Sequence, residues 1–334
     1  MNSHITSTII SVVIPLYNKS EHITRAIDSV LSQTIQNFEV IVVNDGSTDG
    51  GEKKVIAYND PRIRLINQIN QGVSVARNNG VDEAQSELIA FLDADDEWYP
   101  DYLENILKLR KKYPEAGLYS ATRYFSDGKK LHLKLSTLEY GWEGIVSSPF
   151  GFFGVNGAFP GCTITSVIPK RIFQEMGGFP VNVQLGEDWD LWGRIAFHYP
   201  VAHIEKALGI IHMDAVNKLT NNKMYQNITT HPLQVSIASY PHDILYNHPQ
   251  YDDILLCMDR LNIWMATLHI ENGRGYVARS VLKRVHNKKL LRLKLFLYVV
   301  STIPFISNPR ILDLGVKCYS FVRRIVINIM KISK

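Results

Sequence analysis

One junction in the chain limits its possible folds more than any other feature. The apolar residues 88–92 follow Glu87 and lead directly into three aspartates, Asp93, Asp95 and Asp96. Carboxylates gathered at the end of a buried strand repel one another, and a cation is needed to offset that cost. Open α/β sheets bind ligands at the carboxyl ends of their strands. Because Mg²⁺ and Mn²⁺ prefer carboxylate oxygens, the junction predicts a divalent metal site; the alternative is an aspartate-rich helix cap.

Strand-like and helix-like segments alternate through the first third of the chain. The predicted strands are continuous apolar runs, whereas the predicted helices carry apolar residues three and four positions apart. We expect strands at residues 9–14, 38–43, 62–66 and 88–92, and helices at 20–31, 73–84 and 98–112. This alternation predicts an α/β fold with a Rossmann-like, mostly parallel sheet flanked by helices.

The glycine-rich phosphate loops of the common Rossmann classes are missing from the sequence. It contains neither G-x-G-x-x-G after the first predicted strand nor G-x-x-x-x-G-K-S/T, and it lacks the basic glycine-rich loop of sugar-phosphate nucleotidyltransferases. A nucleotide bound to this sheet would therefore be held by side chains and a metal.

Short motifs follow one another in a recognisable order. They read SVVIPLYN at residues 11–18, VVNDGSTD at 42–49, GVSVARNNG at 72–80, FLDADD at 91–96, and GGFP at 177–180 with GEDWDLWGR at 186–194. In this order and spacing they resemble the motifs of family 2 glycosyltransferases, over about residues 8–212. The resemblance implies the GT-A fold, inversion at the anomeric carbon, a nucleotide-sugar donor and a divalent metal.

The resemblance also implies a kind of reaction. The Gln-x-x-Arg-Trp element of processive members is absent, so we expect single transfers by a hexosyltransferase. We expect it to move a sugar from a nucleotide diphosphate donor, a UDP-sugar, to a glycan or lipid-linked acceptor in surface polysaccharide biosynthesis. Two alternatives remain, a catalytically silent member that binds a nucleotide or glycan, and a nucleotidyltransferase.

Four residues match positions that bind the nucleotide sugar in the family. Pro15 and Tyr17, just past the first predicted strand, correspond to the surface that packs against the base. Asp45 corresponds to the acceptor of hydrogen bonds from the base, and Arg77 to a position facing the diphosphate, where a guanidinium suits phosphate oxygens. The alternatives are a core tyrosine, a simple Asn-Asp-Gly turn and a helix-surface arginine.

The metal-binding positions of the family match Asp93, Asp95 and His212. Asp93 resembles the carboxylate that contacts the ribose or the water shell of the metal, and Asp95 resembles the direct ligand of Mn²⁺ or Mg²⁺. Asp96 either supports these groups or starts the following helix. His212 follows another short apolar strand, where many members place a histidine that meets the metal or the diphosphate. Here Ile210 and Ile211 replace the aromatic-Arg pair that commonly precedes it.

Glu187 and Asp188 correspond to the acceptor-side motif of the family. Inversion requires a base that removes the proton of the acceptor hydroxyl as that hydroxyl attacks the anomeric carbon. Asp188 matches this base, and Glu187 is the next candidate. Carboxylates are also favoured at a helix N-terminus, and both interpretations can hold together. Arg194 is predicted to pair with a nearby carboxylate.

Between the two groups of motifs lies a segment rich in glycine and aromatic residues, at residues 140–165. Such a segment either lines a sugar-binding surface or forms an ordinary packed loop. The sequence is equally compatible with both interpretations.

The C-terminal part of the chain differs in charge from the rest. Residues 282–334 contain twelve Lys or Arg and one acidic residue, Asp313. Basic amphipathic segments bind anionic membrane surfaces, and the alternative is a helical pair that closes the core. We therefore expect a catalytic domain at 1–215, a helical extension at 216–281 and a membrane-associating tail at 282–334.

The expected location follows from composition. Three cysteines without C-x-x-C spacing favour a reducing compartment, and no uncharged apolar run approaches the roughly 18 residues of a spanning helix. The N-terminus does not resemble a signal peptide. We expect a cytoplasmic protein that is peripheral on the inner face of the plasma membrane and has no nucleic-acid partner.

Overall fold

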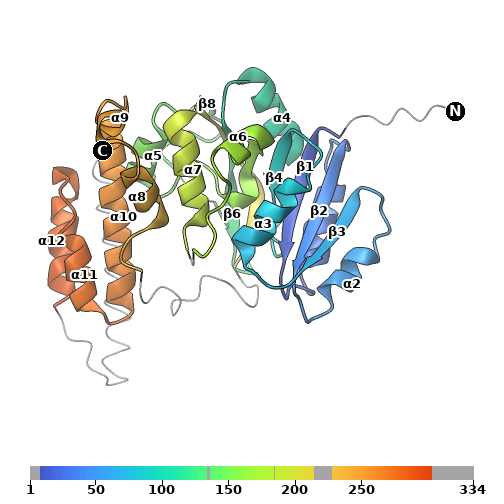
Figure 1. The fold of residues 1–334 in the computed structure, drawn as a ribbon, viewed down its shortest axis with the longest axis horizontal. Coiled ribbons are helices and arrows are strands. Elements are labelled where there is room, and N and C mark those ends of the chain that lie inside the picture. The colour runs from blue at the N-terminus through green and yellow to red at the C-terminus, as the bar shows by residue number, and fades with distance from the viewer. Residues whose placement is uncertain (1–7, 134–135, 184, 214–227, 303–334) are drawn as a thin grey trace. The chain divides into compact units, whose positions relative to one another are not determined.

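The computed structural model describes residues 8–133, 136–183, 185–213 and 228–302. Its contacts divide the chain into two compact units. The first comprises Met1–Pro149 and Phe159–Lys218, and the second comprises Phe150–Ala158 and Leu219–Lys334. The first unit contains the sheet, whereas the described part of the second is helical (Figure 1).

The first unit is built on one sheet, in which the strands lie in the order β3-β2-β1-β4-β9-β6-β10-β5, with β7 beside β6 and β8 beside β10. The strands are β1 Ile10–Leu16, β2 Phe38–Asp45, β3 Ile63–Gln68, β4 Leu88–Phe91, β5 Glu97–Trp98, β6 Leu118–Ser126, β7 Leu131–Leu133, β8 Glu143–Ile145, β9 Ser166–Pro169 and β10 Val201–His212. The first four pair in parallel, as do β6 and β10. The predicted α/β fold is confirmed, but the antiparallel β9 between β4 and β6 has no counterpart among the predicted strands.

Helices cover both faces of this sheet (Figure 1). They are α1 Ile23–Leu31, α2 Gly51–Ile56, α3 Val73–Asp82, α4 Tyr102–Lys112, α6 Lys170–Glu175 and α7 Glu187–His198. The helix predicted from residue 98 begins only at Tyr102, because Glu97 and Trp98 pair with β10 as the short strand β5. This pairing joins residues more than 100 positions apart and cannot be read from local periodicity.

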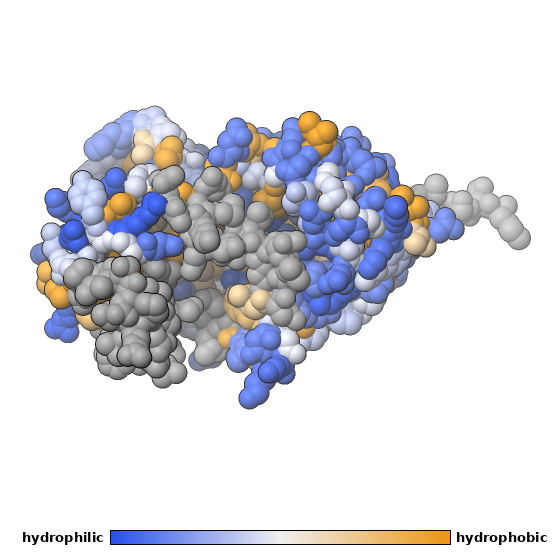
Figure 2. Space-filling view, turned by 90° about the horizontal axis from the view of Figure 1, so that it is seen from below, coloured by the Kyte–Doolittle hydropathy of each residue, from blue (hydrophilic) through white to orange (hydrophobic). Residues whose placement is uncertain are grey.

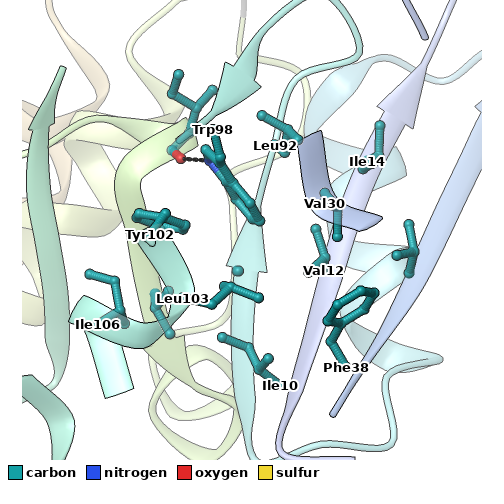
Figure 3. Close-up of a cluster of buried hydrophobic side chains, with 14 of the residues drawn as sticks. Ile10, Val12, Ile14, Val30, Phe38, Leu92, Trp98, Tyr102, Leu103 and Ile106 are labelled. Carbon is teal, nitrogen blue, oxygen red and sulfur yellow. Dashed lines mark hydrogen bonds between the residues drawn. The ribbon is translucent and has the colours of Figure 1, made fainter. Parts of the chain in front are cut away.

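Side chains from one face of the sheet form a large apolar core with α1 and α4. Ile10, Val12 and Ile14 alternate along β1 and are fully buried in it. Figure 3 shows Val12 and Ile14 near Val30 of α1, and Ile10 near Leu103 of α4. Burial of this alternating set, together with Val13 on the opposite face, explains why β1 reads as a continuous apolar run.

The other face of the sheet is covered closely by α3. A side-chain Cβ at Gly80 would lie 2.4 Å from a methyl carbon of Val13, so only glycine allows the helix to approach β1 this closely. The approach places the N-terminal half of α3 beside the carboxyl ends of the strands. The glycine of the GVSVARNNG motif therefore has a packing role.

The second unit contains α5 Pro149–Asn156, apart from its first residue, and the helices α8 Pro232–Ala238, α9 His242–Tyr246, α10 Tyr251–Glu271, α11 Gly275–Leu282 and α12 Leu291–Val300. The last three share one apolar cluster, to which α12 contributes Leu293 and Leu297. No helix in the described ranges is long and apolar enough to cross a membrane. On the face seen in Figure 2, hydrophobic residues are scattered among hydrophilic ones.

The aromatic segment at residues 140–165 is mainly packed. Phe150, Phe153 and Phe159 are at most 3% exposed, so their faces do not line a sugar-binding surface. Tyr140 in the same segment is 61% exposed, so a sugar-binding surface stays a prediction for the rest of the segment.

Candidate functional site

The loops that follow β1 and β2 are fastened to each other at the carboxyl edge of the sheet. Asn18 takes a left-handed conformation with φ of 50°. Its backbone N–H donates to the Ser47 hydroxyl over 3.1 Å, and its side-chain oxygen accepts from the Thr48 N–H over 2.8 Å. The Ser20 N–H donates to Asp49 over 2.8 Å. The chain between Tyr17 and Ser20 is therefore fixed at both ends.

The predicted base-binding residues lie at this edge. Tyr17 is 49% exposed, so its ring is accessible to a ligand. Pro15 lies within β1 and not past it, because β1 extends to Leu16. Its missing N–H is tolerated because β4 pairs with β1 only as far as Val13, which leaves one side of β1 without a neighbouring strand at Pro15.

Asp45 holds the loop that leads into α3. Its Oδ1 accepts from the side chain of Gln68 and the N–H of Gln71, both over 2.8 Å, and its Oδ2 accepts from the N–H of Gly72 over 2.9 Å. The residue is only 3% exposed. Asp45 thus accepts three hydrogen bonds from the protein itself, and its contact with a base stays a prediction.

Arg77 connects motifs that are far apart in the sequence. Its guanidinium lies 2.8 Å from Asp93 Oδ1 and 3.0 Å from Glu187 Oε1, and it stacks on the ring of Phe179 at 5.2 Å. The side chain is 5% exposed. Burial alone lowers the pKa of Arg77, but the carboxylates of Asp93 and Glu187 outweigh this effect and raise it. Arg77 is therefore not the helix-surface arginine of the alternative interpretation, and its contact with a diphosphate stays a prediction.

Asp95 is held by two basic residues that follow β1. Lys19 Nζ lies 2.7 Å from Asp95 Oδ2, and the guanidinium of Arg25 donates to the Asp95 carbonyl. Asp95 Oδ1 accepts no hydrogen bond from any residue that the structure describes. Lys19 and Arg25 do not appear among the residues identified from the sequence, because nothing in their local spacing connects them to the aspartates.

Asp96 and His212 belong to a buried support of the site. Asp96 accepts from the backbone N–H of His212 over 2.9 Å and is 4% exposed. Burial, together with the charges of Asp93 and Asp95, raises the pKa of Asp96 well above its usual range. Because β5 follows Asp96, the residue supports its neighbours and does not start a helix.

The ring of His212 contacts the carboxylate of Glu97. Its Nε2 lies 2.8 Å from Glu97 Oε1, and its side chain is 13% exposed. The structure places this histidine beside the aspartate cluster, at the end of β10, with its ring paired to Glu97. A role as a metal ligand stays a prediction.

Asp188 lies in the first turn of α7, as expected for a carboxylate at a helix N-terminus. Its Oδ1 accepts from the N–H of Trp189 over 2.8 Å, and its Oδ2 accepts from the Thr163 hydroxyl over 3.2 Å. Burial and the neighbouring charge of Glu187 raise the pKa of Asp188 to about 6. A carboxylate with this pKa is suited to accept a proton near neutral pH.

Arg194 anchors the helix that carries Asp188. It pairs with Asp190 over 2.7 Å and donates to the carbonyl of Gly178 over 2.8 Å. The predicted structural pairing of Arg194 is therefore confirmed. It ties the GGFP segment to α7, so the two parts of the acceptor-side motif have a common support.

The residues present are chemically suited to a divalent cation. Asp93 and Asp95 offer hard oxygen ligands, and Asp95 Oδ1, which accepts no hydrogen bond from a described residue, could coordinate a cation. Within the described ranges, no three His, Cys, Asp or Glu side chains form a ready-made metal cage. A metal here would take its remaining ligands from water and from the phosphates of a bound nucleotide.

Comparison with known proteins gives consistent results. The model of Glycosyl transferase family 2 matches residues 11–173. An uncharacterized glycosyltransferase of Rickettsia felis is 35% identical over 328 residues, which are 96% of this chain and 47% of that protein. The chain thus spans about half the length of the Rickettsia felis and Rickettsia conorii relatives.

Two solved structures show the same fold. Residues 1–349 of S. aureus TarS, in complex with UDP-GlcNAc, match with a TM-score of 0.66 and 16% identity over 88% of both chains. The mannosyltransferase PcManGT of Pyrobaculum calidifontis, in complex with GDP-Man and Mn²⁺, matches with a TM-score of 0.56 and 18% identity, covering 96% of this chain and 87% of its own. These structures show that the chain has the GT-A fold. The match to the family model and the similarity to the relatives show that the chain belongs to glycosyl transferase family 2.

Proposed function

We propose that the chain transfers one sugar at a time from a nucleotide diphosphate donor, a UDP-sugar, to a hydroxyl of a glycan or lipid-linked acceptor, with inversion at the anomeric carbon. The observation that carries the proposal is the bridge made by Arg77. It joins Asp93, at the donor edge of the sheet, to Glu187, next to the candidate base Asp188. Surface polysaccharide biosynthesis is the process that we propose for such a transfer.

Each part of the site has a role in this proposal. Tyr17 provides a surface for the base, and Asp45 provides an oxygen for a base N–H. Asp95, with Asp93 beside it, would hold Mn²⁺ or Mg²⁺, which when bound neutralises the charge of the leaving diphosphate. Asp188 would take the proton of the acceptor hydroxyl, and Arg77 would keep Glu187 and Asp93 at a fixed separation.

A panel of nucleotides tests this proposal. In the presence of Mn²⁺, UDP is expected to raise the melting temperature of the protein, and EDTA is expected to remove this increase. GDP, dTDP and CMP should raise the melting temperature less. Asp95→Asn should abolish the metal-dependent shift, because an amide binds hard cations weakly. Asp127→Asn, in an exposed turn, is the matched control and should behave like the parent. Equal stabilisation of Asp95→Asn and the parent would rule out Asp95 as the ligand.

The described part of the tail provides a surface that suits the proposed membrane partner. Leu293 and Leu297 of α12 are buried in the core of the second unit. The opposite face exposes an apolar row, Leu291, Leu295 and Val299, next to the exposed basic residues Lys288, Lys289 and Arg292. An apolar row flanked by basic residues matches an anionic lipid surface. The rest of the tail, 303–334, lies outside the described residues.

Co-sedimentation with liposomes of rising anionic content tests this surface. The triple variant Leu291→Gln, Leu295→Gln, Val299→Gln should lose most binding, and binding of the parent should weaken, but persist, as salt rises. The control, Val235→Gln with Ile244→Gln, changes exposed apolar residues elsewhere in the same unit. If the triple variant and the control sediment like the parent, α12 does not hold the protein on membranes.

A further inference from the structure

Lys19 lies in a loop whose backbone is held by hydrogen bonds on both sides of this residue. Its neighbour Asn18 is fastened to Ser47 and Thr48, and its other neighbour Ser20 is fastened to Asp49. The backbone on both sides of Lys19 is therefore fixed before any ligand binds. Such preorganisation lowers the entropy cost of holding the long side chain in one position.

The ammonium group of Lys19 lies on the carboxylate that is the candidate metal ligand. The distance from Nζ to Asp95 Oδ2 is 2.7 Å, and the two side chains are 12% and 17% exposed. The guanidinium of Arg25 adds a second positive charge at the carbonyl of the same residue. Partial burial reduces solvent screening, so these charges act more strongly than a pair on the surface.

A divalent ion on Asp95 would compete with this ammonium group or lie close to it. Two cations that share one partly buried carboxylate repel each other. A nucleotide diphosphate brings negative charges that offset this repulsion, and its oxygens accept hydrogen bonds from an ammonium group. The site is therefore electrostatically unfavourable for the metal alone and favourable for the metal together with a diphosphate.

We propose that Lys19 occupies the cation position on Asp95 before ligands bind and couples metal binding to nucleotide binding. When a diphosphate arrives, the ammonium group transfers from Asp95 to a phosphate oxygen, and Asp95 then accepts the metal. Lys19 is a positioning residue in this scheme, since it controls which cation Asp95 holds. The coupling to nucleotide binding rests on the proposed function. The contact between Lys19 and Asp95 does not depend on that function.

Electron paramagnetic resonance of free Mn²⁺ tests this coupling without an activity assay. In the parent, Mn²⁺ alone should bind weakly. UDP should raise the affinity for Mn²⁺ about 10-fold or more, which is a typical size for the coupling between two binding sites. Lys19→Gln should bind Mn²⁺ alone about 10-fold more tightly, and the effect of UDP should fall by a similar factor. Lys19→Arg keeps the positive charge and should retain most of the coupling.

Matched measurements separate this inference from the proposed function. Lys108→Gln removes a lysine that pairs with Glu104 over 2.6 Å on the surface, and it should leave Mn²⁺ binding unchanged. If Lys19→Gln, folded by circular dichroism, binds Mn²⁺ alone no more tightly than the parent, the inference is wrong even when UDP binds. If Lys19→Gln gains Mn²⁺ affinity but neither protein binds UDP, the proposed donor is wrong and the contact between Lys19 and Asp95 retains its role.

Discussion

Arg77→Met is expected to lower the free energy of unfolding by about 3–5 kcal/mol, the usual loss when one partner of a buried ion pair is removed. The guanidinium is buried and offsets the charges of Asp93 and Glu187. Without it, the partly buried carboxylates of Asp93 and Glu187 lose the cation that they share. Urea denaturation followed by circular dichroism measures the change.

The control for this prediction is Arg171→Met. Arg171 pairs with Glu175 over 3.2 Å at the surface, where such pairs contribute about 0–1 kcal/mol. Equal losses for Arg77→Met and Arg171→Met would show that Arg77 does not hold the two motifs together. The contacts of Arg77 with Asp93 and Glu187 would then no longer support the proposed function.

Asp188→Asn is expected to reduce turnover by a factor on the order of 10²–10⁴, the usual contribution of a general base, while donor affinity stays near that of the parent. The amide keeps the shape of the side chain and one of its two acceptor oxygens, but it cannot take a proton. Single-turnover assays with a UDP-sugar and titration calorimetry with UDP separate the two effects. If turnover stays within a few-fold of the parent, the base lies elsewhere, and Glu187→Gln is the next variant.

The pKa of Asp188 gives this prediction a second test. Since burial and Glu187 raise the pKa of Asp188 to about 6 from an ordinary value near 3.8, activity of the parent should rise with pH through about 6. The ionised carboxylate is disfavoured in the folded state, so its cost to stability appears as pH rises from about 4 to 6. Asp188→Asn should therefore be more stable than the parent at pH 8, and the difference should disappear below about pH 4.

Local sequence patterns predict the half of the sheet that positions the donor site. β1 and β2 are buried on both faces, and their apolar runs identify them without further information. The predicted end of this strand at residue 14 is two residues early, because β1 continues through Pro15 to Leu16, where β4 no longer pairs with it. Asp93, Asp95 and Asp96 directly follow the apolar run of β4. Their position at the carboxyl edge of the sheet can therefore be predicted from the sequence.

The partners of the site residues depend on contacts that local patterns do not contain. Arg77 and Glu187 are 110 positions apart, and Lys19 and Asp95 are 76 positions apart. The antiparallel β9 has only four residues, and its pairing with β4 and β6 depends on the tertiary fold. In α12, one apolar face is buried and the other is exposed, a distinction that composition alone does not make.

A crystal structure with Mn²⁺ and UDP, measured at the manganese absorption edge, tests the central claim most directly. The account predicts one anomalous peak within about 2.1 Å of an Asp95 carboxylate oxygen, with the diphosphate completing its coordination and the base against Tyr17 and Asp45. It also predicts that Lys19 Nζ has moved from Asp95 to a phosphate oxygen. A nucleotide bound away from Asp93 and Asp95, or a manganese ion on other ligands, would contradict the account.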